Sequence, residues 1–308
     1  MQFISQIKEG VEFIQLVEDN NVLFSVSPDH GARLTDLYFK VNNALHSVLW
    51  EVSPNDCKTG EWSKSEILFP FPNRIEDGKY EFEGISYQLP VNEKRYNNAI
   101  HGMVTNVKFE AIDQRIEDNT ASLKLRYKYN GGKSYYPFPF VLDMTYEYGS
   151  DGFNVIFDVK NSGAGNLPFG LGWHPYFKLG DRGLSGLRYA IPESDHLLLG
   201  NRSLPTGEVQ NFSQANLNLE DWNLDDCFRL KQSEVSYILA SDQISLKMTG
   251  SDAFRYLQLF TPEGLGTIAI EPMTSGVNVF NNHEGIRFLK SMETFQVSFK
   301  ISVYHSNE

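Results

Sequence analysis

His174 lies in one of four segments that could carry chemistry, a stretch rich in aromatic residues and prolines that runs from Pro168 to Phe177. Such surroundings hold an imidazole rigidly and remove water from around it, which is how the pKa of a catalytic group is shifted. The alternative is a core histidine that is hydrogen-bonded to a backbone carbonyl. The segment therefore makes His174 a candidate for proton transfer.

Glu271 follows the apolar run Thr267–Ile270 and directly precedes Pro272. This order predicts a carboxylate at the end of a strand, at the rim of a sheet. A carboxylate in such a place is either one partner of a buried ion pair or a general base. An anionic Glu271 close to His174 would favour the protonated imidazole, so the two residues together could supply a base and an acid.

Arg74 and His101 are candidates for holding a ligand. Arg74 follows a run of prolines and phenylalanines, and its planar fork of donors suits sugar hydroxyls or a carboxylate. The alternative is a surface loop in which Arg74 pairs with Glu76 or Asp77. His101 precedes a glycine, and a lone histidine of this kind is also compatible with a structural role.

Asp225 and Asp226 form an adjacent pair of carboxylates after Trp222. Neighbouring side chains of a strand point to opposite faces, so we expect only one of the two to face a site. Asp225 and Glu271 could also serve as the two carboxylates of a glycoside hydrolase, and the distance between them would decide this.

Alternating apolar and polar residues dominate the remaining sequence and predict strands with one face on a core and one in water. The clearest cases are residues 123–129, 142–148, 153–159 and 295–303. The turn residues 149–152 join the second and third of these segments and predict an antiparallel hairpin.

Helical periodicity is nearly absent, apart from a short helical turn that residues 61–68 could form. Many short strands between Gly, Pro, Asn and Asp residues favour an all-β fold, a large antiparallel β-sandwich, over folds that alternate strands and helices. Because neither a repeat nor a linker is visible, residues 1–308 are expected to form a single domain.

The composition of the chain disfavours several classes of function. The formal net charge of −12 disfavours nucleic-acid binding, and no basic cluster suggests a membrane surface. No apolar run reaches the length of about 18 residues that a membrane span needs, and the N-terminus shows no secretory signal. Cys57 and Cys227 are too few for a disulfide framework or a thiolate metal site. We therefore expect a soluble, cytoplasmic protein.

Motifs for nucleotide cofactors and for a catalytic serine are missing, namely the phosphate-binding loop, the dinucleotide fingerprint and the nucleophile elbow. None of the seven histidines has the H-E-x-x-H or H-x-H spacing of a zinc site. The sequence thus predicts neither a cofactor nor a metal.

Taken together, the candidate segments resemble the aldose 1-epimerase (galactose mutarotase-like) family. The matching residues occur in family order and are Pro72–Ile75 with Gly78 and Tyr80, His101–Gly102, His174–Phe177, Asp225 with Phe228, and Glu271–Pro272. The resemblance runs from about residue 30 to the C-terminus. It implies a galactose mutarotase-like β-sandwich of the supersandwich type, with the site on a concave face. It also implies His174 as general acid and Glu271 as general base, with Arg74, His101 and Asp225 holding the sugar.

The implied activity is the interconversion of the α- and β-anomers of a free hexose, with a small sugar as the partner and the protein as a monomer or homodimer. Trp173 and Pro175 flank the histidine where strict galactose mutarotases carry Asn and Ser or Thr, which fits a broader epimerase branch. One alternative is a hexose-6-phosphate 1-epimerase that uses Lys94 and Arg95 for the phosphate. Another is a non-catalytic carbohydrate-binding protein, which would need no acid–base pair.

Overall fold

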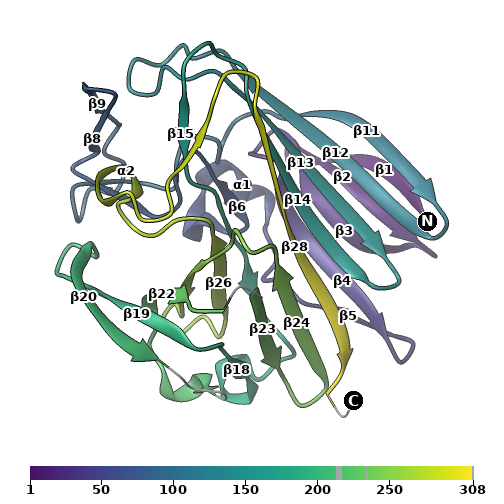
Figure 1. Ribbon diagram of the computed structural model, residues 1–308. Coiled ribbons are helices and arrows are strands. Elements are labelled where there is room, and N and C mark those ends of the chain that lie inside the picture. Colours follow the sequence, from purple (N-terminus) through teal and green to yellow (C-terminus); the bar gives the residue numbers. More distant parts are fainter. Residues whose placement is uncertain (213–216, 233–234, 307–308) are drawn as a thin grey trace.

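A computed structural model of the chain describes residues 1–212, 217–232 and 235–306 (Figure 1). Within these residues, all pairings between strands are antiparallel, and helices are short. The predicted all-β class is therefore confirmed. No helix of the described residues is both long and apolar enough to cross a membrane. Cys57 and Cys227 are buried and unpaired.

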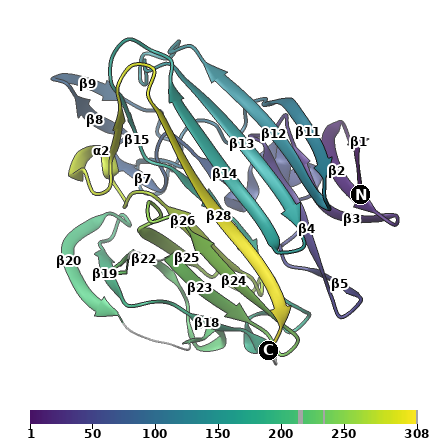
Figure 2. The ribbon, with the colours of Figure 1, turned by 45° about the vertical axis from the view of Figure 1, so that its right-hand side comes forward.

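The largest sheet contains the strands that the alternating pattern predicted. Its spatial order in the described residues is β11 (Glu110–Glu117), β12 (Thr120–Tyr129), β13 (Phe140–Gly149), β14 (Gly152–Asn161), β28 (Thr294–His305), β24 (Ile244–Gly250), β23 (Val235–Ala240), β18 (Arg188–Ala190) and β21 (Leu217–Asn218). The predicted hairpin is confirmed, because β13 and β14 pair up to Gly149 and Gly152. In Figure 2 the long strands β12, β13, β14 and β28 run side by side.

A second sheet carries the candidate site. Its order is β20 (Pro205–Phe212), β19 (Ser194–Leu199), β22 (Asp225–Leu230), β25 (Tyr256–Phe260), β26 (Ile268–Met273), β16 (Gly172–His174) and β6 (Glu66–Leu68), with β17 (Tyr176–Phe177) also paired to β26. A third, N-terminal sheet consists of β1 (Gln2–Lys8), β2 (Val11–Glu18), β3 (Asn21–Ser27), β4 (Arg33–Val41) and β5 (Ala44–Ser47).

Short elements connect these sheets. Three two-stranded pairs join β10 (Asn98–Ile100) to β7 (Arg74–Glu76), β15 (Leu167–Phe169) to β27 (Arg287–Leu289), and β8 (Lys79–Phe82) to β9 (Ile85–Gln88). The helical elements are α1 (Pro54–Thr59), η1 (Glu61–Ser63), η2 (Gly183–Gly186), η3 (Leu219–Asp221) and α2 (Val279–Asn282). The helical turn expected at residues 61–68 is thus confined to η1, and its last three residues form β6 instead.

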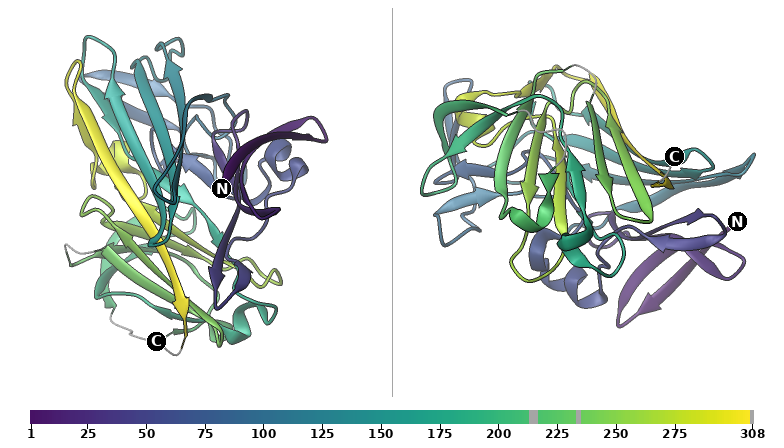
Figure 3. Two further views of the ribbon diagram at one scale, coloured as in Figure 1. Left: turned by 90° about the vertical axis from the view of Figure 1, so that its right-hand side faces the viewer. Right: turned by 90° about the horizontal axis from the view of Figure 1, so that it is seen from below.

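The core lies where the sheets pack on one another. The ring of Phe24 in β3 is 5.4 Å from that of Phe153 in β14, and Figure 3 shows the N-terminal strands beside the largest sheet. The fully buried Trp173 of β16 is 6.3 Å from Phe299 of β28. Because side chains alternate across a strand, Trp173 fixes β16 to the core and leaves the next residue, His174, on the opposite face.

Candidate active site

Glu271 lies in the interior of the second sheet rather than at its rim. Strand β26 continues through Pro272 to Met273 and has β25 on one side and β16 with β17 on the other. The prediction of a strand end before Pro272 was therefore wrong. The structural reason is that this strand is buried on both faces, so its sequence shows no alternation that would mark its true end.

The register of the strands places His174 opposite Glu271. Strands β16 and β17 both pair with β26, through Gly172 with Met273 and Tyr176 with Ala269. The backbone N–H of Ile270 donates to the carbonyl of Pro175 at 3.2 Å, so the register continues across this proline. The carbonyl of His174 accepts a hydrogen bond from the N–H of Ser65, at 2.8 Å, which fixes the backbone of the histidine.

The side chains of His174 and Glu271 form a buried pair, with His174 Nε2 3.2 Å from Glu271 Oε1. Burial lowers the pKa of His174 to about 4, and the charges of Arg33 and Arg74 act in the same direction. Burial also raises the pKa of Glu271 well above its usual range, and the charge of Asp225 adds to this effect. Both shifts favour the uncharged form of each group, a neutral imidazole and a protonated carboxyl, and oppose the expected pair of a protonated His174 and an anionic Glu271.

A chain of hydrogen bonds forms the polar floor of the site. Gln258 Nε2 donates to Asp225 Oδ1 at 2.9 Å, and Asn73 Nδ2 donates to Gln258 Oε1 at 3.1 Å. Asn73 Oδ1 in turn accepts from the backbone N–H of Arg74 at 2.9 Å. Gln258 lies opposite Glu271 in the register of β25 and β26. The chain therefore links the carboxylate of Asp225 to Arg74 beside the acid–base pair.

Arg74 is almost completely buried and pairs with Glu93. Its Nε donates to both carboxylate oxygens at 3.0 Å, and its Nη2 lies 2.9 Å from Glu93 Oε1. Glu76 and Asp77, the partners considered in the alternative, instead contact Arg202. The structure therefore places Arg74 in the site and not in a surface ion pair.

His101 packs edge-on against His174, with 5.1 Å between the ring centroids. Its backbone has a φ of 64°, and Gly102 has a φ of 75°. A Cβ on Gly102 would approach the carbonyl oxygen of Phe69 to 2.1 Å, so this position accepts only glycine. Nδ1 of His101 and Oε2 of Glu271 are buried without a hydrogen-bond partner in the described residues. Buried polar atoms without a partner are uncommon in folded proteins, which marks this part of the structure as a candidate site.

These side chains surround a cavity of about 340 Å³, a size that suits a small organic ligand. All five residues singled out from the sequence line it, namely Arg74, His101, His174, Asp225 and Glu271. Asp226 points away and bonds to His196 at 2.8 Å, as strand alternation predicted for one of the two aspartates. Aromatic walls come from the side chains of Trp62, Tyr96, Tyr176 and Phe260.

Arg95 also lines the cavity, whereas Lys94 does not. Arg95 is exposed, and its guanidinium lies 5.0 Å from the ring centre of Tyr96. In the residues that the structure describes, no ion-pair partner within 4.0 Å of Arg95 is found. One cation is thus free at the mouth of the cavity.

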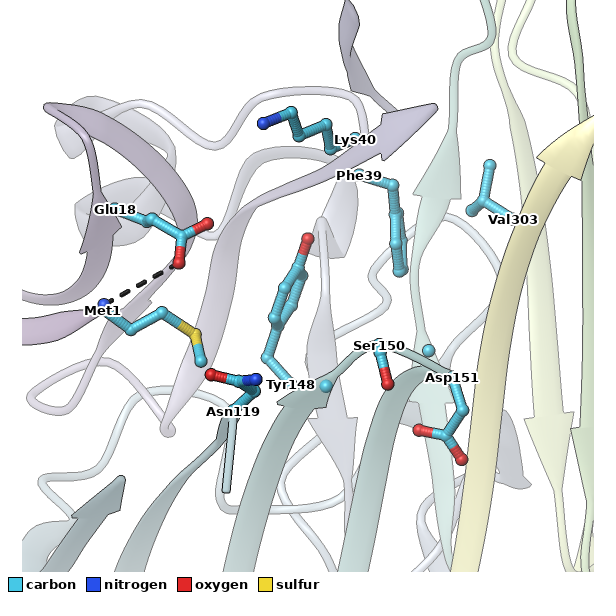
Figure 4. A pocket seen from close by; sticks show the side chains of 11 residues that line it. Met1, Glu18, Phe39, Lys40, Asn119, Tyr148, Ser150, Asp151 and Val303 are labelled. Atoms are coloured by element: carbon cyan, nitrogen blue, oxygen red, sulfur yellow. Dashed lines mark ion pairs between the residues drawn. The ribbon is translucent and has the colours of Figure 1, made fainter. Parts of the chain in front are cut away.

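A larger cavity, of about 420 Å³, lies away from this site beside the hairpin of β13 and β14 (Figure 4). Its ion pair joins the Met1 ammonium to Glu18 at 3.7 Å. Histidine is absent from its lining, and its titratable side chains are Glu18, Lys40, Tyr148 and Asp151. Size alone therefore does not identify the reactive cavity, since the smaller one holds the acid–base pair.

Metal binding has no structural support in the described part of the chain. No group of three or more His, Cys, Asp or Glu side chains there could hold an ion.

Three further residues of the site, Asn73, Glu93 and Gln258, were not predicted from the sequence. A glutamine inside the apolar strand Tyr256–Phe260 was a visible signal, because a buried polar side chain needs partners.

Comparison with known proteins identifies the family and the fold of this chain. A family model described as aldose 1-epimerase matches residues 13–302. The uncharacterized protein YihR of Escherichia coli K12 is 25% identical over 280 residues, which cover 88% of this chain and 87% of YihR.

Two solved structures show the same fold. A galactose mutarotase-like protein of Clostridium acetobutylicum superposes with a TM-score of 0.86 at 20% identity, covering 99% of this chain and 98% of the other. A galactose 1-epimerase of Lactobacillus acidophilus NCFM has a TM-score of 0.79 at 16% identity, with coverages of 99% and 98%. The galactose mutarotase-like fold expected from the sequence is therefore confirmed.

Proposed function

Because this chain belongs to the aldose 1-epimerase family, we propose that it interconverts the α- and β-anomers of a free hexose by opening and closing the sugar ring. The observation that carries the proposal is the buried pair of His174 Nε2 and Glu271 Oε1, 3.2 Å apart, in the wall of a cavity of about 340 Å³. Ring opening needs one group that accepts a proton and one that donates a proton. The pair supplies both from two side chains in contact.

Ring opening transfers two protons. Glu271, through its unpartnered Oε2, takes the proton of the C1 hydroxyl, and the C1 oxygen forms the carbonyl. The C1–O5 bond breaks, its electron pair goes to the ring oxygen O5, and His174 protonates O5. Rotation about C1–C2 then presents the other face of the aldehyde. The same two transfers in reverse close the ring as the other anomer.

The number of protons that His174 and Glu271 hold together fits this cycle. Opening starts with the proton on His174 and ends with a protonated Glu271 and a neutral His174. The free protein already holds one proton in the pair, on Glu271, because burial raises the pKa of that carboxyl and lowers the pKa of His174. The proton therefore has to cross only the 3.2 Å contact to reach the state from which the ring opens. No net proton exchange with solvent is needed in a turnover.

The remaining polar residues hold the sugar. Arg74 and Asp225, at the two ends of the hydrogen-bonded floor, are placed to contact hydroxyls on different edges of the ring. His101 offers its unpartnered Nδ1 beside His174. Apolar patches of a sugar ring pack against aromatic faces, for which Trp62 is suited because 42% of it is exposed at the cavity.

The test follows anomer exchange directly. Freshly dissolved α-D-glucose, α-D-galactose and a pentose are each equilibrated with the protein, and polarimetry or NMR records the rate. We expect acceleration above the buffer rate without added metal or nucleotide, and none with the His174→Asn variant. Rates equal to buffer for every sugar would show the proposal to be wrong. Release of nitrophenol from aryl glycosides would instead indicate a glycosidase.

A hexose-6-phosphate 1-epimerase is the second candidate, and the observation in its favour is the free cation of Arg95 at the mouth of the cavity. Against it, Arg74 is already paired with Glu93, and the formal net charge is −12. A dianionic ligand would thus approach against the mean field of the protein. A higher kcat/KM for glucose 6-phosphate than for glucose, lost in Arg95→Gln, would favour this candidate.

A further inference from the structure

A second polar cavity, of about 540 Å³, is lined in part by residues of β19, β22 and β25 in the same sheet. In strand β22 the side chains of Asp225, Cys227 and Arg229 share one face, because every second residue does. Asp225 lines the sugar cavity and Arg229 lines the second one. Four residues of a strand span about 13 Å, so the two cavities are neighbours on one surface.

An apolar layer separates the two cavities. It consists of buried side chains that pack on one another, namely Leu197, Cys227, Tyr256, Met273 and Val277. Burial raises the pKa of Tyr256 to about 12 and keeps its phenol neutral. The second cavity is therefore a site of its own and not an extension of the polar floor around Glu271.

Four cationic side chains line this second cavity, and two of them have carboxylate partners. Arg229 lies 2.8 Å from Asp195 and 3.9 Å from Glu284. Lys231 lies 3.2 Å from Glu193 and 3.4 Å from Asp195. These acids offset the charges of Arg229 and Lys231.

The other two, Arg255 and Arg287, have no carboxylate within 4.0 Å among the residues that the structure describes. Arg255 donates to the carbonyl of Lys231 at 3.4 Å. The guanidinium of Arg287 lies 4.3 Å from the ring centre of Phe295, and its Nε is buried without an acceptor. Burial lowers the pKa of Arg287, and the charge of Asp252 counteracts this only in part.

We propose that this cavity binds a small ligand that carries a phosphate group, held by Arg255 and Arg287. Two planar guanidinium groups without carboxylate partners among the described residues match the oxygens of a phosphate, which such groups bind through paired, charge-assisted hydrogen bonds. In a chain with a net charge of −12, two uncompensated arginines in one cavity are a local exception to the repulsive mean field.

The test measures binding without using the sugar reaction, so its outcome is independent of the proposed function. Inorganic phosphate is titrated into the whole protein by calorimetry at low ionic strength, with sodium chloride at equal ionic strength as the blank. We expect saturable binding at one site. Arg255→Gln and Arg287→Gln should each raise the Kd at least about tenfold, the effect of losing one charge-assisted hydrogen bond.

Arg182→Gln is the matched control, because Arg182 is exposed and pairs with Asp242 outside this cavity, and it should leave the Kd unchanged. Arg95→Gln removes the cation of the sugar cavity and therefore distinguishes phosphate binding there from binding in the second cavity. Thermal unfolding checks that each variant is folded. If Arg287→Gln is not folded, the Kd of Arg255→Gln alone decides whether this cavity binds phosphate.

The absence of saturable binding would overturn the proposal. It would also be overturned if the affinity were lost in Arg95→Gln and kept in the two cavity variants, since the phosphate would then occupy the sugar cavity. An equal loss in Arg182→Gln would show general charge attraction only and would refute the site as well.

Discussion

Replacing Glu271 by Gln tests the acid–base pair with the smallest structural change. The amide has the shape of the carboxyl group and can keep the 3.2 Å contact with His174 Nε2. It cannot accept a proton from the C1 hydroxyl. The variant therefore removes the chemistry and leaves the geometry of the cavity in place.

A positioned general base contributes about 10²–10⁴-fold to a rate, or about 3–5 kcal/mol of barrier. We expect kcat of Glu271→Gln to fall by at least about 10²-fold in polarimetry of fresh α-D-glucose. KM should change by less than about threefold, because the amide still contacts the sugar and Arg74 and Asp225 are untouched. A kcat within about threefold of the unmodified protein would refute the assignment of the base.

The stability of the same variant should increase, relative to that of the unmodified protein, as the pH rises. The folded state raises the pKa of Glu271, so this residue binds a proton more tightly in the folded than in the unfolded chain. Its contribution is fully present below the unfolded pKa of about 4.3 and is lost as the pH rises through the folded pKa.

Gln does not titrate, so Glu271→Gln should become more stable relative to the unmodified protein as the pH rises from the unfolded pKa through the raised folded pKa of Glu271. Each pKa unit of elevation corresponds to about 1.4 kcal/mol in urea unfolding. A difference in stability that does not vary with pH would show that burial does not raise the pKa of Glu271.

Three further predictions follow from the geometry of the cavity. Towards acid pH, kcat/KM should fall with a midpoint near pH 4, where His174 takes up a second proton for the pair. A midpoint near the ordinary pKa of histidine would contradict the desolvation of His174. Trp62→Ala should raise KM about three- to tenfold with little change in kcat, and Phe288→Ala, an equally exposed aromatic outside the cavity, should raise neither. Glu93→Gln should raise KM more than it lowers kcat, because the fork of Arg74 loses the carboxylate that fixes it, and a change confined to kcat would argue against a binding role.

The strands of the largest sheet were predictable because apolar and polar residues alternate in their sequence. Residues 123–129, 142–148 and 153–159 lie inside β12, β13 and β14. Burial follows the alternation in β14, whereas in β13 the polar Asp143 and Thr145 are buried as well. Strand β26 shows no such alternation, since all six of its residues are buried. The sequence therefore placed Glu271 at a strand end, although the strand continues. Helix α1 had a visible signal that was not used, the capping box of Ser53 and Asp56.

The site shows a similar division. The candidate side chains were recognisable one by one, because each interrupts the alternating pattern or lies among aromatic residues and prolines. The hydrogen bonds that connect them were not, because they join distant parts of the chain. Asn73 and Gln258, whose side chains lie 3.1 Å apart, are separated by 185 positions. Only the register of β22, β25 and β26 brings Gln258 beside Asp225 and Glu271.

Burial also explains why the pair of His174 and Glu271 is suited to a reaction that returns its protons. One proton between two buried groups can leave both of them uncharged, and this is the form that costs least in a site without water. In the proposed reaction, the charged form, with the proton on His174, becomes favourable when sugar hydroxyls donate to Glu271 and the ring oxygen accepts from the imidazole. Ring opening then discharges the pair again, since it leaves Glu271 protonated and His174 neutral. The desolvation that shifts both pKa values therefore favours the step that breaks the ring, and a mutation that admits water beside the pair should slow the reaction even where both residues remain.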